Sequence, residues 1–180
     1  MGDIKIAGFG GSLRKGSYNR MLLGAASELM PEGSSLEIAE IYDIPLFNQD
    51  LESAMPASVV EFKRKISASD GILICTPEYN YSVPGILKNV IDWGSRPYGQ
   101  SCFEGKHVAL MSSGGGLGGA RAQYSLRQSF VFLNMKPLNG PEVFVSRAAD
   151  KFDEYGHLKD EDVRNKISGL LQRLVDVCRR

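Results

Sequence analysis

Strand-like and helix-like patterns alternate along almost the whole chain, and this alternation limits the folds that it can adopt. Short apolar runs occur at residues 3–9, 36–41, 71–75, 107–111 and 136–145. Helical spacing of apolar residues occurs at 18–30, 59–66, 84–93, 119–133 and 160–178. Alternating strands and helices are typical of a parallel β-sheet with helices on both faces, so the sequence predicts an α/β fold of five strand–helix units.

The pattern inside two of these runs predicts their place in the sheet. Residues 71–75 are apolar throughout, as in a central parallel strand, whereas residues 36–41 alternate apolar and charged side chains, as in an edge strand. For a chain of 180 residues with no repeat and no linker, we expect one domain over residues 1–180. The natural architecture at this length is a doubly wound five-stranded sheet in the order 2-1-3-4-5, with ligand-binding loops after the first, third and fourth strands.

The charge balance argues against two classes of partner. Lys and Arg together number 21, and Asp and Glu also number 21, so the net charge is zero. Proteins that bind nucleic acids or membrane surfaces generally carry a basic excess, and no apolar run approaches the ~20 residues of a membrane span. We therefore expect no nucleic acid and no membrane partner. Because Cys75, Cys102 and Cys178 are widely spaced, we also expect no metal site and a cytoplasmic location with reduced thiols.

A first loop, Gly10–Asn19, joins the first predicted strand to the first predicted helix and is rich in Gly, Ser, Asn and Arg. Glycines let the backbone approach a ligand, and hydroxyl groups and a helix N-terminus favour an anion. The loop departs from the dinucleotide fingerprint, because Leu13 stands at the third glycine, and from the nucleotide P-loop, because Lys15 precedes Gly16. We interpret it as a cradle for a terminal monophosphate; an ordinary loop before a capped helix is the alternative.

A second loop, Thr76–Gly85, follows the third predicted strand and concentrates residues that suit a planar ligand. Pro77 and Pro84 fix its shape, and two tyrosines, a glutamate and an asparagine lie between them. Backbone amides and flat side chains in such a loop can hold a heteroaromatic ring. The alternative is that Tyr79 and Tyr81 only pack against neighbouring loops or a partner subunit.

A third loop, Ser112–Arg121, follows the fourth predicted strand and is dominated by glycine. Gly114, Gly116 and Gly119 match the dinucleotide fingerprint literally. The match is interpreted as accidental, because it follows the fourth strand rather than the first and no acidic residue is placed to bind a ribose. The glycines would instead let the backbone lie against a ring edge, and a flexible loop without contacts is the alternative.

Taken together, the three loops resemble those of NAD(P)H-dependent FMN reductases of the flavodoxin-like group, which includes bacterial quinone, chromate and azo-dye reductases. The first matching segment is Gly11–Arg14 with Ser17 and Asn19. The second and more specific one comprises Pro77–Asn80, Ser82–Gly85, Leu87–Asn89 and Asp92–Trp93. The resemblance extends over roughly residues 3–145, and the final helix matches in kind.

The resemblance implies a flavodoxin-like FMN-binding domain and a set of cofactor-binding residues. Those near the phosphate would be Ser12, Arg14, Ser17, Tyr18 and Asn19. Those along one side of the isoalloxazine ring would be Pro77, Glu78, Tyr79, Asn80 and Ser82, and Ser113, Gly114 and Gly115 would close the other side. Lys88, Asn89, Asp92 and Trp93 would serve helix packing or subunit contact. The resemblance also implies a homodimer or homotetramer.

The implied activity is ping-pong electron transfer. NADPH or NADH would give a hydride to FMN, and two electrons would then pass to a small acceptor: a quinone, an azo compound, chromate or free flavin. Because the flavin carries this chemistry, no side chain is needed as a catalytic nucleophile or base, and Cys75 is interpreted as a core residue. Helix 84–93, ending in Trp93, and the aromatic segment 98–103 would offer apolar surface to a partner subunit.

A flavodoxin-type electron carrier without NAD(P)H turnover is the alternative function. Such carriers are usually strongly acidic, which steers basic partners, whereas this chain has no net charge. A flavin-binding sensor is a third hypothesis, which no feature of the sequence favours. The sequence leaves open the acceptor, the choice between NADH and NADPH, and whether FMN is a prosthetic group or a substrate.

Overall fold

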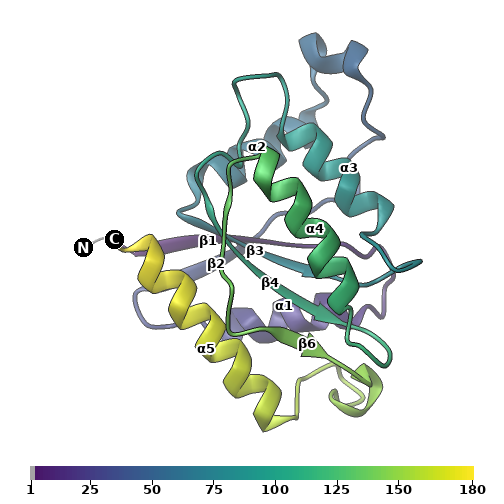
Figure 1. The fold of residues 1–180 in the computed structure, drawn as a ribbon, viewed down its shortest axis with the longest axis vertical. Helices are drawn as coiled ribbons and strands as arrows, with labels where there is room; N and C mark the ends of the chain where they lie inside the picture. The colour runs from purple at the N-terminus through teal and green to yellow at the C-terminus, as the bar shows by residue number, and fades with distance from the viewer. Residues whose placement is uncertain (1–2) are drawn as a thin grey trace.

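The computed structural model describes residues 3–180 and contains one parallel sheet covered by helices on both faces (Figure 1). The strands are β1 (Ile4–Gly10), β2 (Ser34–Ile38), β3 (Gly71–Thr76), β4 (His107–Ser113), β5 (Lys136–Pro137) and β6 (Val143–Val145). The helices are α1 (Tyr18–Glu28), α2 (Ala57–Ala68), α3 (Gly85–Gly94), α4 (Ala120–Phe132) and α5 (Glu161–Cys178). No helix within these described residues is long and apolar enough to cross a bilayer.

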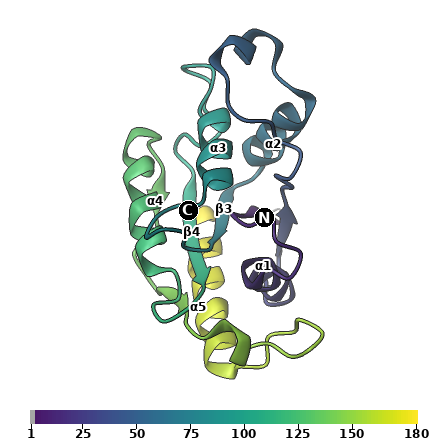
Figure 2. The same ribbon diagram turned by 90° about the vertical axis from the view of Figure 1, so that its right-hand side faces the viewer.

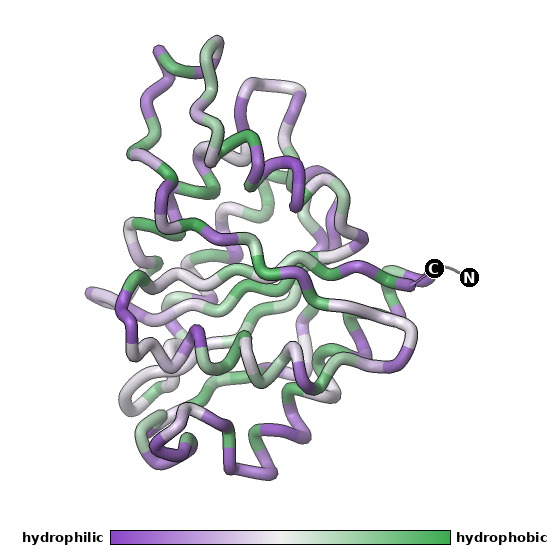
Figure 3. The backbone as a smooth tube through the Cα atoms, turned by 180° about the vertical axis from the view of Figure 1, so that it is seen from behind, coloured by the Kyte–Doolittle hydropathy of each residue, from purple (hydrophilic) through white to green (hydrophobic). Residues whose placement is uncertain are grey.

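The strand order β2-β1-β3-β4-β5, with every pair parallel, confirms the predicted order 2-1-3-4-5. β3 lies at the centre and is buried along its whole length, as its apolar sequence predicts. Its side chains alternate between the two faces: Ile72 and Ile74 join one core cluster, and Leu73 and Cys75 join the other. Figure 3 shows hydrophobic residues along the central strands and hydrophilic ones towards the outer turns.

The helices divide between the two faces of the sheet. α1 and α5 pack over one core cluster, and α2, α3 and α4 pack over the other. Figure 2 shows α1 and α5 below the sheet and α2 and α3 above it. The loops that follow β1, β3 and β4 therefore gather at one edge of the sheet, between the two helical layers.

The prediction of a single strand over residues 136–145 is wrong. The segment is divided into β5 and β6, which both pair with β4, and the residues between them are not in the sheet. Pro137 and Pro141 carry no backbone N–H, so this stretch cannot donate a continuous ladder of hydrogen bonds. The second strand is also displaced: it covers Ser34–Ile38 rather than 36–41, and Ala39 and Ile41 are instead buried in the core.

The segment between β2 and α2 lies along α3 and hides a surface that the sequence assigned to a partner subunit. Asn89 accepts a hydrogen bond from the Phe47 amide (2.7 Å) and donates one to the Pro45 carbonyl (2.9 Å). The Trp93 indole donates to the same carbonyl at 2.8 Å. Trp93 and Phe103 are therefore buried within the chain and cannot belong to the expected apolar docking surface, of which Tyr98 alone is strongly exposed, at 68%. Asn89 and Trp93 therefore serve helix packing, which is one of the two roles that the sequence analysis expected for them.

Candidate functional site

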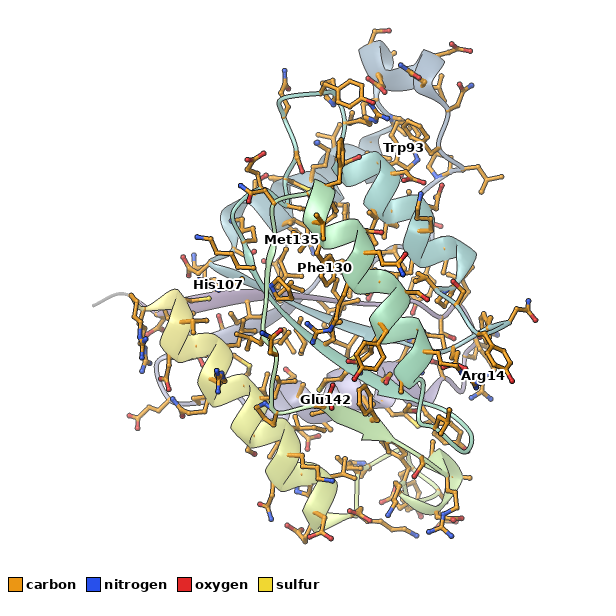
Figure 4. The ribbon with its side chains drawn as sticks, in the orientation of Figure 1. Arg14, Trp93, His107, Phe130, Met135 and Glu142 are labelled. Carbon is orange, nitrogen blue, oxygen red and sulfur yellow. The ribbon has the colours of Figure 1, made fainter. Side chains whose placement is uncertain are left out.

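The loops after β1, β3 and β4 enclose a cavity of ≈ 170 Å³ at the carboxyl edge of the sheet. Ten predicted cofactor-binding residues line it: Ser12, Arg14, Ser17, Tyr18, Asn19, Pro77, Glu78, Tyr79, Ser113 and Gly114. Figure 4 shows Arg14 at the edge of the molecule where these loops meet. Of the other predicted residues, Gly115 lines a neighbouring depression, and Asn80 and Ser82 line neither cavity.

The first loop presents two serine hydroxyl groups at the start of α1, of which that of Ser12 accepts a hydrogen bond from the Arg14 amide at 3.4 Å. Ser17 precedes the helix with extended backbone angles, but its side chain makes no capping hydrogen bond. Ser12 and Ser17 are both buried, and the first turn of α1 holds no acidic residue. The hydroxyl groups and the positive end of the helix dipole are therefore available to an anion. The Gly11 amide donates to the Cys75 carbonyl (2.8 Å), which fixes this loop to the end of β3.

Asn19 joins the first loop to the third. Its side-chain amide donates to the Ser113 carbonyl at 3.0 Å, and its side-chain oxygen accepts from the Ser113 amide at 2.9 Å. Both residues are buried. The Asn19 amide group is thus engaged by backbone, so the residue holds two walls of the cavity together; its predicted contact with a phosphate stays a prediction.

Ser113 leaves a buried hydroxyl without a partner among the described residues. Ser112, its neighbour in β4, faces the other way and accepts a hydrogen bond from Gln123 of α4 at 2.8 Å. Ser113 pairs with Val145, which belongs to the core under α1 and α5, so the Ser113 side chain lies on the α1 side of the sheet. Buried polar groups are generally hydrogen-bonded. The free hydroxyl on this wall therefore fits a polar ligand in the cavity, such as a phosphorylated flavin.

The second loop forms a tight turn at Tyr79–Ser82. The Tyr79 amide donates to the Ser82 carbonyl (3.2 Å), and the Ser82 amide donates to the Tyr79 carbonyl (2.9 Å). Asn80 and Tyr81 take positive φ angles of 51° and 66°, as the two central residues of a type I′ turn do. Asn tolerates this conformation, whereas it is uncommon for a bulky residue such as tyrosine. Asn80 and Ser82 therefore shape the loop that carries Tyr79.

Glu78 and Arg121 connect the second loop to the beginning of α4. The Glu78 carboxylate accepts from the Arg121 amide (3.0 Å) and from its guanidinium nitrogen Nε (2.6 Å). The Arg121 guanidinium carbon lies 3.5 Å from the centroid of the Tyr81 ring. This contact confirms packing as a role of Tyr81. Sequence reasoning missed the role of Arg121, although a cation in the first turn of a helix opposes the dipole and signals an acidic partner.

Two glycines of the third loop are required by the chain's own packing. Gly118 has φ +60°, and a Cβ there would lie 2.8 Å from backbone atoms of Phe144 and Val145. Gly119 has φ +85°, and a Cβ there would lie 2.8 Å from the Ser112 side chain. The loop is further held because the Gly114 amide donates to the Val145 carbonyl at 3.1 Å. This end of the loop therefore packs against β4 and β6, and its predicted contact with a ligand stays a prediction.

A second depression, of ≈ 520 Å³, lies beside the first and shares Tyr18 and Gly114 with it. Its other lining residues are Gly115, Arg147, Ala148, Ala149 and Asp150. The Tyr18 ring stacks on Phe152, with ring centroids 5.6 Å apart. Sequence reasoning missed residues 147–150, because they follow β6 and no motif marks them.

The thiols of this protein are not activated. Burial raises the pKa of the Cys75 thiol far above its usual range and that of Cys102 to about 12. Cys75 belongs to the core under α1 and α5, as the sequence predicts. These thiols stay protonated at neutral pH, so neither serves as a nucleophile.

Comparisons with known proteins identify the family of this chain. The family model for NADPH-dependent FMN reductase matches residues 4–150. An NAD(P)H-dependent FMN reductase of Pseudomonas aeruginosa is 50% identical over 174 residues, which cover 96% of this chain and 94% of that protein. A quinone reductase of Pseudomonas putida is 49% identical over 168 residues, which cover 92% of this chain and 88% of that protein.

Solved structures extend the comparison. The flavoenzyme NAD(P)H:acceptor oxidoreductase FerB of Paracoccus denitrificans superposes with a TM-score of 0.90 at 34% identity, over 98% of this chain and 97% of that chain. A flavodoxin of Pseudomonas aeruginosa, at 15% identity and a TM-score of 0.58, shares the fold alone. On the family match and the identity of these relatives, the chain belongs to the NADPH-dependent FMN reductase family.

Proposed function

We propose that the protein is an FMN-dependent oxidoreductase that takes a hydride from NADPH or NADH and reduces a small acceptor such as a quinone. The observation that carries this proposal is the cavity lined by Ser12, Arg14 and Ser17 and by Ser113, whose buried hydroxyl has no hydrogen-bond partner among the described residues. Relatives named FMN reductase and quinone reductase, at 50% and 49% identity, support the reaction class.

The first loop would hold the phosphate of FMN. Ser12 and Ser17 would donate hydrogen bonds from their hydroxyl groups, and Arg14 would add a charge-assisted contact. The unopposed N-terminus of α1 supports the same position for the anion. A terminal monophosphate matches this single loop better than a dinucleotide does, because the fingerprint glycine is replaced by Leu13.

The second and third loops would hold the flavin ring between them. Pro77 and Tyr79 line the cavity from one side, and Ser113 and Gly114 line it from the other. The Glu78–Arg121 contact ties these two sides together, so the width of the cavity is fixed before a ligand enters. Bound FMN would supply the hydride acceptance and the two-electron transfer; the protein binds and orients it.

The electron-carrier alternative is weaker. Carriers of that kind are usually acidic, and this chain has a net charge of zero. The relatives at 49–50% identity carry the names of reductases, whereas the flavodoxin shares only 15% identity.

We also propose a cytoplasmic location, because Cys75, Cys102 and Cys178 are free thiols rather than disulfides.

We also place a homodimer contact on the outer face of α4, instead of the buried Trp93 region. Tyr124, Val131 and Phe132 lie on one stripe of this helix, and Val131 and Phe132 are 85% and 76% exposed. Apolar side chains that are neighbours and so exposed are typical of an interaction surface. A second copy of this chain could cover them through an isologous contact.

Replacing Arg14 by alanine should weaken FMN binding by roughly tenfold to a hundredfold, because one charge-assisted contact is worth about 1.5–3 kcal/mol. Riboflavin, which has no phosphate, should bind the variant and the wild type equally. Fluorescence titration of both flavins measures this. Arg20→Ala, which removes an exposed arginine of α1 that lies over Tyr42, is the matched control. Equal binding of FMN and riboflavin by the wild type would show that the phosphate assignment is wrong.

Anaerobic addition of NADPH or NADH to the FMN-loaded protein should remove the visible absorbance of the oxidised flavin, and benzoquinone should restore it. The reason is that a cavity open beside Tyr79 admits both a nicotinamide and a quinone. Absorbance spectra recorded after each addition measure this. If the spectrum stays oxidised with an excess of both nucleotides but changes with dithionite, the protein is an electron carrier.

Light scattering at micromolar concentration should give the wild type a mass of at least twice the 19.7 kDa chain. Val131→Glu should lower that mass, because a charge cannot be desolvated at an apolar contact without a partner. Val60→Glu, at a half-exposed position of α2, should leave the mass unchanged. A wild-type mass near that of one chain contradicts the dimer.

A further inference from the structure

The depression beside the proposed FMN cavity shares Tyr18 and Gly114 with it but extends beyond the three loops, to residues 147–150. One phosphate needs one anion site, and the first loop supplies it. On the other side of Tyr18 and Gly114 lies a larger hollow of ≈ 520 Å³, which contains a second arginine, Arg147. Its volume falls in the range of ~300–1,000 Å³ typical of small-ligand sites.

Arg147 is held in place by the third loop. Its amide donates to the Gly115 carbonyl at 3.2 Å, and the next amide, of Ala148, donates to the Gly114 carbonyl at 3.4 Å. Arg147 has φ 47° and ψ 51°, a left-handed backbone conformation that is unfavourable for residues other than glycine. Its side chain is exposed and makes no ion pair with another residue in the range 3–180. The backbone thus presents an uncommitted guanidinium at the rim of the hollow.

The walls of the hollow suit a flat, partly apolar group. The Tyr18 ring stacks on Phe152, with an angle of 25° between the ring planes, and the Arg14 guanidinium carbon lies 5.4 Å from its centroid. Gly114, Gly115, Ala148 and Ala149 are small and leave the floor open. Asp150 lines the same hollow and can accept hydrogen bonds from ribose hydroxyls or an exocyclic amine. Lys151, the next cationic residue along the chain, pairs with Asp160. It therefore does not compete with Arg147 for a ligand.

We propose that this hollow binds the phosphate-bearing adenosine half of the nicotinamide co-substrate, with Arg147 contacting a phosphate. The inference rests on the proposed function, because it requires NADPH or NADH to be the electron donor. The hollow combines the Arg147 guanidinium, the Tyr18 ring and the Asp150 carboxylate, and it borders the flavin cavity. These features match a dinucleotide whose nicotinamide half must reach the flavin. The adenylyl group of FAD has the same chemistry, so the experiment separates the two sources.

Calorimetric titration of the FMN-saturated protein with ADP-ribose and with 2′-phospho-ADP-ribose tests this. The wild type should bind at least one probe, and Arg147→Ala should weaken that binding about tenfold, as expected for one charge-assisted hydrogen bond. Arg147→Gly should weaken it equally, because both variants lose the guanidinium while only glycine relaxes the left-handed backbone. Arg173→Ala, which removes an exposed arginine of α5, should have no effect. FMN affinity should be unchanged in every variant.

Three results would overturn the proposal. The wild type could fail to bind either probe, or both Arg147 variants could bind the probes as the wild type does. In the third case Arg147→Ala weakens FAD binding and leaves ADP-ribose binding intact, which assigns the hollow to a flavin dinucleotide. None of these measurements needs turnover, so a failure of the proposed oxidoreductase activity is detected separately, by the spectrum of the flavin after NADPH or NADH is added.

Discussion

The paired hydrogen bonds between Asn19 and Ser113 are the contact on which the site depends. They join the beginning of α1 to the end of β4, across 94 positions of sequence. β1 and β4 are not neighbours in the sheet, because β3 lies between them. The bridge therefore spans the end of the central strand and fixes the first loop relative to the third. Being buried, it is protected from competition with water.

A second bridge completes the arrangement. Glu78 of the second loop and Arg121 of α4 are linked by two hydrogen bonds, and Tyr81 packs on the same guanidinium. All three loops are thus tied to one another without a ligand, which limits the conformational freedom that would be lost on binding. These contacts leave uncommitted the hydroxyl groups of Ser17 and Ser113 and the guanidinium of Arg147, while the Arg14 guanidinium lies over the Tyr18 ring. Those free groups define what the protein can recognise.

The alternation of strands and helices, together with the chain length, predicted the sheet order. The composition of three loops predicted where a ligand would bind, and the resemblance to the reductase family implied the individual residues that line the cavity. The errors come from contacts between distant segments. Trp93 looked like surface because nothing in its own helix shows that residues 45–47 cover it. The sequence 136–145 looked like one strand, although its prolines interrupt the ladder. Asn19 and Glu78 were recognised as site residues, but their partners Ser113 and Arg121 lie 94 and 43 positions away, and composition cannot pair them. Arg147 follows no motif at all.

The most direct test of this account is the flavin affinity of Asn19→Leu, a substitution of similar volume that removes both hydrogen bonds to Ser113. Since the bridge positions two walls of the cavity rather than one ligand atom, FMN and riboflavin should both bind at least about tenfold more weakly to the folded variant, whose sheet is checked by circular dichroism. Affinities equal to those of the wild type for both flavins would contradict the account, because the cavity would then form without the bridge.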